Sequence, residues 1–186
     1  YVYGEELSTP GSTSFQNFPV RRNHSWVNLG LTYQSFVLDK DHFHLGLHGQ
    51  AVFNSQSFFA NYTATLLAMN EFSLVPDAKT FFLPEYRAPQ FLAGGINVVG
   101  TLRKNLDIRL DAYFFQPILR IIQTDNGSLV FSEYFDGETF MASASMIYHT
   151  FLGPLRASIN YFPKQVNPVS FQISFGYVLF NERAIR

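Results

Sequence analysis

The sequence predicts an all-β protein, an antiparallel transmembrane β-barrel, and three observations support this. Along many segments of about ten residues, every second side chain is apolar or aromatic, as in a membrane-spanning strand. Aromatic residues make up 17% of the 186-residue chain, with 21 Phe and 10 Tyr, which suits lipid-facing bands and interfacial girdles. No run of about 18 uncharged apolar residues occurs, which excludes a helical membrane span.

The alternation is clearest at the C-terminal end, where residues 153–162 and 169–180 form a predicted pair of strands. One face of this pair is apolar: Leu155, Ala157, Ile159, Tyr161, Val169, Phe171, Ile173, Phe175, Tyr177 and Leu179. The other face is polar: Arg156, Ser158, Asn160, Ser170, Gln172 and Ser174. Such a pair can face lipid on one side and water on the other.

The same test predicts six further strands upstream, each with one apolar and one mostly polar face. They cover residues 26–37, 42–53, 58–69, 95–103, 106–114 and 140–148. This gives eight strands, with a ninth at residues 1–5. Residues 7–25 are rich in Pro, Gly and Ser and leave room for another hairpin, so the register of residues 1–24 is not fixed by the pattern.

The predicted connections fall into two groups by length, and no domain boundary interrupts residues 1–186. Short turns at 54–56, 104–105 and 151–154 are typical of the periplasmic end of a barrel. The long segments 70–92 and 117–138 are typical of extracellular loops. Strand counting places the shorter segments 38–41 and 163–168 at that same outer end.

Composition excludes several other classes of protein. A formal net charge of −1 leaves no basic stripe for a nucleic acid, and the absence of Cys excludes a disulfide framework and a cysteine metal site. His42, His44 and His48 share one face, but no acidic or cysteine ligand accompanies them, so we interpret them as hydrogen-bonding residues rather than a metal site. No Gly-x-Ser-x-Gly motif occurs, and Asp136-Gly137 is first of all a turn dipeptide, so we expect neither catalysis nor a cofactor.

The alternative interpretation is a soluble, lipocalin-like β-barrel that binds an apolar ligand, in which the apolar face would be a core. A soluble sheet normally carries Lys and Glu on its solvated face. Here the polar face consists mostly of Ser, Thr, Asn, Gln and Gly, and charged residues total only 15% of the chain. The pattern therefore favours the membrane barrel.

Several segments resemble one superfamily of bacterial outer-membrane proteins. Residues 151–162, Phe-Leu-Gly-Pro-Leu-Arg-Ala-Ser-Ile-Asn-Tyr-Phe, resemble the penultimate strand of BamA/TamA-type barrels, the bacterial surface antigen superfamily. Residues 83–95, Leu-Pro-Glu-Tyr-Arg-Ala-Pro-Gln-Phe-Leu-Ala-Gly-Gly, are similar to the C-terminal barrel of Bacteroidetes patatin-like phospholipases, as are residues 20–26 and 179–183. The resemblance covers about residues 20–183.

This resemblance implies a barrel of about sixteen strands, of which the chain supplies the C-terminal half. In the superfamily five strands follow the sixth extracellular loop, which folds into the lumen and carries an Arg-Gly-aromatic motif. Here 70–92 is the matching loop and Arg87 the matching arginine, although Ala88 replaces the glycine. The resemblance implies that Arg87 meets the carboxylate of Asp111. Asp107 also points inward by the alternation, so either could pair with a buried guanidinium.

The last predicted strand also resembles the C-terminal signal that the barrel-assembly machinery reads, through Ser174, Gly176, Leu179 and Phe180. The resemblance implies a location in the bacterial outer membrane, where the segment anchors or translocates a secreted N-terminal domain of the patatin-like lipid hydrolase type, or takes part in assembly or transport. The expected partners are outer-membrane lipid, the assembly machinery, and either missing N-terminal strands or a second copy that closes the sheet.

Overall fold

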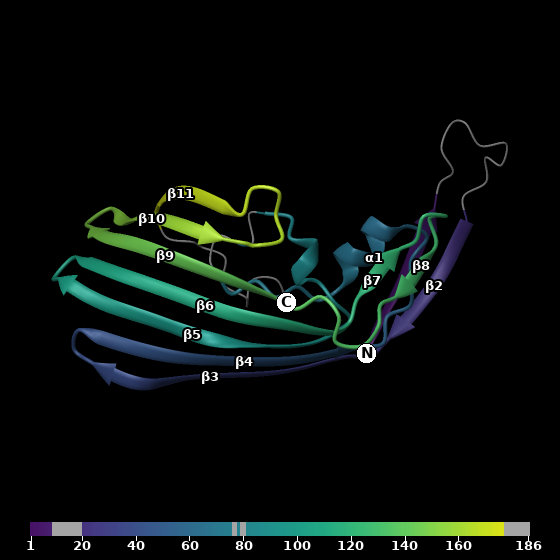
Figure 1. Cartoon of the computed structure of the whole chain (residues 1–186), viewed down its shortest axis with the longest axis horizontal. Coiled ribbons are helices and arrows are strands. Elements are labelled where there is room, and N and C mark those ends of the chain that lie inside the picture. Colours follow the sequence, from purple (N-terminus) through teal and green to yellow (C-terminus); the bar gives the residue numbers. More distant parts are fainter. Residues whose placement is uncertain (9–19, 76–77, 79–80, 177–186) are drawn as a thin grey trace.

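A computed structural model of the chain describes residues 1–8, 20–75, 78 and 81–176. Its main feature is a curved, antiparallel sheet of seven strands in the order β11-β10-β9-β6-β5-β4-β3 (Figure 1). Two separate hairpins, β1-β2 and β7-β8, lie beside one end of this sheet. No sheet formed by the described residues closes into a barrel.

The elements have the following bounds: β1 Val2–Ser8, β2 Val20–Trp26, β3 Asn28–Lys40, β4 Phe43–Asn54, α1 Tyr62–Ala68, η2 Pro84–Tyr86, β5 Gln90–Arg103, β6 Leu106–Leu119, β7 Ile121–Gln123, β8 Leu129–Phe131, β9 Thr139–Thr150, β10 Gly153–Tyr161 and β11 Val169–Phe175. Seven of the eight predicted strands are present, so the antiparallel all-β prediction is confirmed for the main sheet. The predicted ninth strand corresponds to β1, which pairs with β2 as a hairpin in the region of undetermined register.

The predicted strand at 58–69 is wrong, because this segment contains the short helix α1. The side chain of Asn61 caps it by accepting a hydrogen bond of 2.7 Å from the backbone N–H of Ala64. Leu66 and Met69, three residues apart, are both buried, which is helical rather than strand spacing. None of the described helices is long and apolar enough to cross a membrane.

The loss of that strand also changes the end of the sheet at which some connections lie, because the chain reverses direction with every strand. The turns at 41–42, 104–105 and 151–152 lie together at one end of the sheet, on the left in Figure 1. The long connections 55–89 and 120–138 lie at the other end. The predicted placements of 38–41 and 54–56 are therefore exchanged, whereas 70–92, 117–138 and 163–168 stay on one side.

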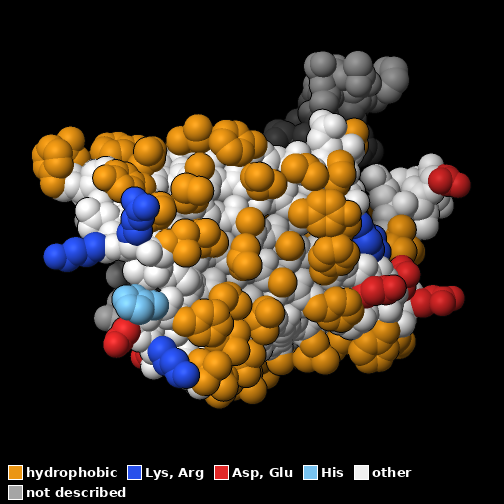
Figure 2. All heavy atoms as spheres, turned by 60° about the vertical axis from the view of Figure 1, so that its left-hand side comes forward, with side chains coloured by type: hydrophobic (Ala, Val, Ile, Leu, Met, Phe, Trp, Pro, Cys, Tyr) orange, Lys and Arg blue, Asp and Glu red, His pale blue; other side chains and the backbone are white. Residues whose placement is uncertain are grey.

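The strand register keeps apolar side chains together on one face, which we call the outer face. Leu110 in β6, for example, lies opposite Val98 in β5 and Ala144 in β9. Many side chains of the outer face are exposed, among them Leu31 at 73% and Phe171 at 65%. Figure 2 shows apolar side chains spread across the visible face of the molecule, with charged side chains gathered towards its two ends.

The opposite, inner face carries the hydrophobic core at the end with the long connections. The connection 55–89 folds against it and supplies Phe72, Val75, Ala78, Leu83, Tyr86 and Ala88 to a buried cluster with Val52, Phe91, Tyr113, Phe115, Met141 and Phe162. The ring of Phe72 stacks on that of Phe115 with centroids 5.8 Å apart. Burying each such ring contributes about 1.5–3 kcal/mol, so this contact fixes the connection to the sheet.

Gly95 provides a stringent test of the register between β5 and β6. It lies opposite Tyr113, and a Cβ at this position would be 2.1 Å from the carbonyl oxygen of Ala112 and 2.6 Å from the Tyr113 ring. We expect Gly95→Ala to lower the free energy of unfolding by about 1–3 kcal/mol, measured by urea unfolding from detergent micelles. Gly49→Ala is the matched control, because no atom lies within 4 Å of its added Cβ. Equal stability of the two variants would contradict this register.

Candidate functional site

Arg87 lies in the connection 55–89 and binds other residues of that connection. Its Nη2 donates to Oε2 of Glu71, and its Nη1 donates to the carbonyl oxygen of Leu67 at 3.3 Å. The Arg87 and Glu71 side chains are 13% and 22% exposed, so the ion pair is largely shielded from water. The arginine therefore joins the C-terminal end of α1 to the chain that enters β5.

The predicted pairing of Arg87 with Asp111 or Asp107 is not formed in this structure. Glu71 and Arg87 face each other in an antiparallel β-bridge, so the guanidinium finds a carboxylate inside its own connection. The sequence pattern predicts a loop over residues 70–92 and so does not indicate this partner. The only signal in the sequence is that the segment itself contains acidic residues, Glu71, Asp77 and Glu85.

Asp111 is instead the centre of a polar cluster on the inner face. Its carboxylate accepts from Nδ2 of Asn97 at 2.6 Å, from Nε and Nη2 of Arg109 at 2.8 and 2.9 Å, and from the Tyr113 hydroxyl at 3.1 Å. The side chain is 0% exposed. A buried carboxylate needs such donors to offset its desolvation, and the two bonds from Arg109 give a bidentate pair.

Asp107 belongs to a second polar group, nearer the short turns. It accepts from the Thr101 hydroxyl at 2.8 Å and lies 2.8 Å from Nε2 of His149. His44 pairs instead with Asp39 at 2.5 Å. Among the described residues, no three or more His, Cys, Asp or Glu side chains are placed to hold a metal ion.

The predicted closing-strand signal is only partly within the described residues. Ser174 lies opposite Arg156 in the β10-β11 pair, on the inner face. Gly176 has a φ of +101°, which favours glycine, and its N–H donates to the carbonyl oxygen of Pro154 at 3.0 Å. Leu179 and Phe180 lie outside the described residues.

Two anchoring contacts were missed by sequence reasoning. The hydroxyl of Tyr86, in η2, donates to the carbonyl oxygen of Phe140 at 2.6 Å, and burial raises the pKa of this tyrosine to about 12. The Gln165 amide donates to Glu85 at 2.6 Å. Both contacts join the connection 55–89 to the C-terminal part of the chain, and their sequence separation leaves no local signal.

Glu6 ties the β1-β2 hairpin to the same connection. Its Oε1 accepts from the N–H of Ala60 at 2.6 Å, and its Oε2 lies 2.9 Å from Nε2 of His24. His24 in turn lies 2.9 Å from the Ser57 hydroxyl. Burial raises the pKa of Glu6, but the hydrogen bonds from Ala60 and His24 outweigh it, so the pKa lies below its ordinary value of 4.5.

No family model, curated protein or solved structure matches this chain. The geometry of the sheet and of the connection 55–89 therefore carries the functional argument. The resemblance of the sequence to BamA/TamA-type barrels stays a prediction.

A double-mutant cycle tests the partner of Arg87. We expect Arg87→Met and Glu71→Gln to show a coupling free energy of about 1–3 kcal/mol in urea unfolding, because each single change leaves a shielded polar group unpaired. Arg87→Met and Asp111→Asn should be additive within about 0.5 kcal/mol. Coupling of Arg87 to Asp111 but not to Glu71 would contradict the observed ion pair and support the pairing of Arg87 with Asp111 predicted from the sequence.

The Glu6 contact should respond to acid. Since the pKa of Glu6 is lower in the folded chain, its contribution to stability is complete above about pH 4.5 and is lost as the pH falls through the folded-state pKa. Hydrogen exchange at the Ala60 amide should therefore lose protection in acid, relative to its intrinsic rate. Glu6→Gln should remove this acid-dependent loss of protection. If the Ala60 amide of the variant still loses protection in acid, another group titrates.

Proposed function

We propose that this chain forms part of an outer-membrane β-barrel and serves as the membrane anchor of a secreted domain. The observation that carries the proposal is the exposed apolar outer face, which extends in register across all seven strands of the main sheet. Monomeric soluble proteins rarely expose contiguous apolar patches larger than a few hundred Å². Lipid is the solvent that suits such a face.

The arrangement of the inner face supports the same proposal over the soluble alternative. A lipocalin-like barrel would need the regularly alternating apolar face as its core, yet Leu110, at 49% exposure, and its neighbours point outward. The inner face instead carries Asp111, Ser143 and Asn160, all buried, with Ser143 donating to Asn160 at 2.7 Å. Polar inside and apolar outside is the pattern of an outer-membrane barrel.

The direction of the edge strands bears on how the barrel closes. In an antiparallel sheet of seven strands, the first and last strands, β3 and β11, run in the same direction. Pairing β3 with β11 within one chain would need a parallel ladder. Pairing β3 of one chain with β11 of a second copy, held in the same orientation in the membrane, would need one too. An odd number of further strands keeps every pair antiparallel. We therefore propose closure by a separate segment; nine strands would give the sixteen that the resemblance implies.

The inner face also indicates which role the segment fills. The connection 55–89 covers the inner face at one end with an apolar cluster and fixes itself there through Tyr86 and Phe72. An anchor needs no open channel. Translocation of a polypeptide along the inner face would require the connection 55–89 to move away from that face. Anchoring is therefore the function that the geometry supports best.

A charge placed on the outer face tests the proposal. We expect Leu110→Arg to cost about 2–4 kcal/mol of folding free energy in liposomes, as for a charge near the middle of a lipid-facing strand. Ile122→Arg, in the β7-β8 hairpin outside the main sheet, is the control, because Ile122 is 38% exposed. If Leu110→Arg folds as well as the control and the chain stays monodisperse without detergent, the outer face meets water and the proposal is wrong.

A further inference from the structure

Two β-bulges occur where the main sheet approaches its short turns. The register shifts between Phe36 and Leu38 in β3, and between Thr101 and Arg103 in β5. A bulge adds one residue to one strand of a pair, so the side chains that follow it in that strand change face. Strict alternation would turn Lys40 and Arg103 towards the inner face, and the two bulges reverse both.

Both cations therefore lie on the outer face. Lys40 lies opposite Phe43 of β4, and Arg103 lies opposite Leu106 of β6. Directly opposed residues of an antiparallel pair share a face, and Phe43 and Leu106 belong to the apolar rows of the outer face. Lys40 and Arg103 are exposed, as is Lys104 in the adjacent turn. We call these three residues, Lys40, Arg103 and Lys104, the basic cluster. Figure 2 shows Lys and Arg side chains beside apolar ones towards the left of the visible face.

The basic cluster has no counter-ion within the part of the chain that the structure describes. None of its side chains forms an ion pair there, whereas Arg109 pairs with a carboxylate. Asp39 of β3 lies on the inner face and pairs with His44. Asp107 of β6 does the same with His149. At this end of the sheet, the strands thus turn their acids inward and their unpaired bases outward.

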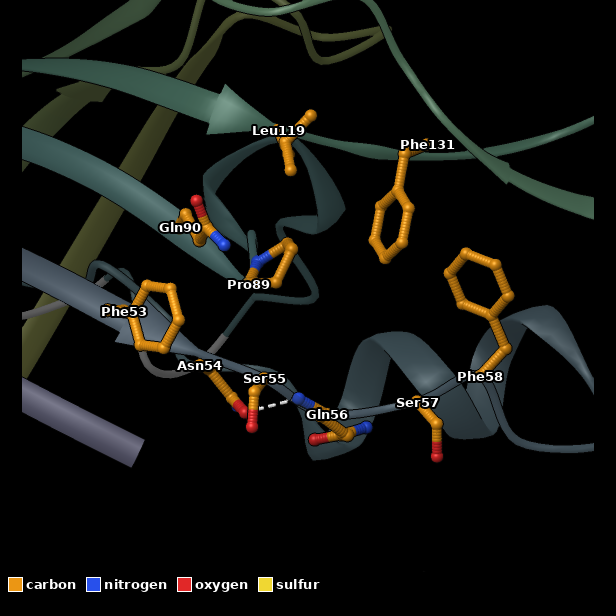
Figure 3. Close-up of a pocket in the computed structure, with 10 residues that line it drawn as sticks. All are labelled: Phe53, Asn54, Ser55, Gln56, Ser57, Phe58, Pro89, Gln90, Leu119 and Phe131. Atoms are coloured by element: carbon orange, nitrogen blue, oxygen red, sulfur yellow. Dashed lines mark hydrogen bonds between the residues drawn. The ribbon is translucent and has the colours of Figure 1, made fainter. Parts of the chain in front are cut away.

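The hollow at the opposite end of the sheet is uncharged. It measures about 420 Å³ and is lined by residues from β4, β5, β6 and β8 and from the chain that follows β4 (Figure 3). All the side chains that Figure 3 labels are uncharged, among them Phe53, Gln90 and Phe131. A phosphate group meets no cation in this lining, so charge distinguishes the hollow from the basic cluster.

We propose that the basic cluster binds the phosphate group of an anionic phospholipid whose acyl chains lie on the outer face. Arg103 can donate two hydrogen bonds to one phosphate, and Lys40 adds a second charge. Only β4 separates β3 from β5, so the two strands lie about 10 Å apart and two long side chains can reach one headgroup. The inference rests on the proposed function, because it needs the outer face to meet lipid. An apolar face alone selects no headgroup, whereas cations beside it select negatively charged ones.

Native mass spectrometry tests the site, with the chain in a neutral detergent and titrated with phosphatidylglycerol or with phosphatidylcholine of the same acyl chains. Both lipids carry a phosphate, but only phosphatidylglycerol has a net negative charge. We expect phosphatidylglycerol to bind about 25-fold more tightly, because each of two cations contributes about fivefold. Lys40→Gln and Arg103→Gln should each lower this preference about fivefold, and Arg103→Lys should retain most of it.

Lys164→Gln is the matched control, because Lys164 is exposed and lies in the connection 163–168 at the other end of the sheet. It should leave the preference unchanged. An unchanged preference in either Lys40→Gln or Arg103→Gln, or an equal loss in Lys164→Gln, would overturn the proposal. Glycerol phosphate, which lacks acyl chains, should not displace the lipid at equal concentration. Displacement would show a site for soluble phosphate and would overturn the lipid site.

Flotation with phosphatidylcholine and phosphatidylglycerol liposomes separates this inference from the proposed function. A chain that floats with phosphatidylcholine but shows no preference for phosphatidylglycerol overturns the headgroup site alone. A chain that floats with neither lipid overturns the membrane anchor and the headgroup site together.

Discussion

The register of the strand pairs is the constraint on which the rest of this structure depends. Side chains in a strand alternate between two faces, so a shift of one residue between neighbouring strands would mix apolar and polar groups. The pairs β5-β6 and β6-β9 keep Val98, Leu110 and Ala144 in one row, and the same holds across the sheet. That register produces an apolar outer face and an inner face with polar side chains, part of which the connection 55–89 covers.

The inner face carries both a buried apolar cluster and a sheltered polar network, because the outward-facing apolar side chains lie on the opposite face. At one end, the connection 55–89 buries Phe72 and Tyr86 against the sheet, while Arg87 and Glu71 hold the connection together internally. Nearer the short turns, Asp111 and its donors form a network that needs shelter from solvent competition. The outer face makes only contacts within its own layer, such as the Phe140 and Tyr161 rings with centroids 5.6 Å apart, and many of its side chains are exposed.

Sequence reasoning predicted the sheet well and the site poorly, for physical reasons. Alternation over ten residues is a local signal, and it located seven strands of the main sheet. It failed at 58–69, where Ala, Leu and Thr residues also suit a helix, and the structure has the helix α1 there with Asn61 as its N-cap. The partner of Arg87 depends on a chain reversal that no local pattern encodes, and the contacts of Tyr86 with Phe140 and of Gln165 with Glu85 join distant segments.

A spin-label scan along β6 would show whether the outer face meets lipid, as we propose. The chain contains no Cys, so single cysteines can be placed at each of residues 106–114 and labelled without background. In liposomes, we expect accessibility to oxygen to alternate with a period of two and to peak at Leu106, Ile108, Leu110, Ala112 and Phe114. High accessibility of these positions to a water-soluble relaxation agent, or no alternation, would contradict it.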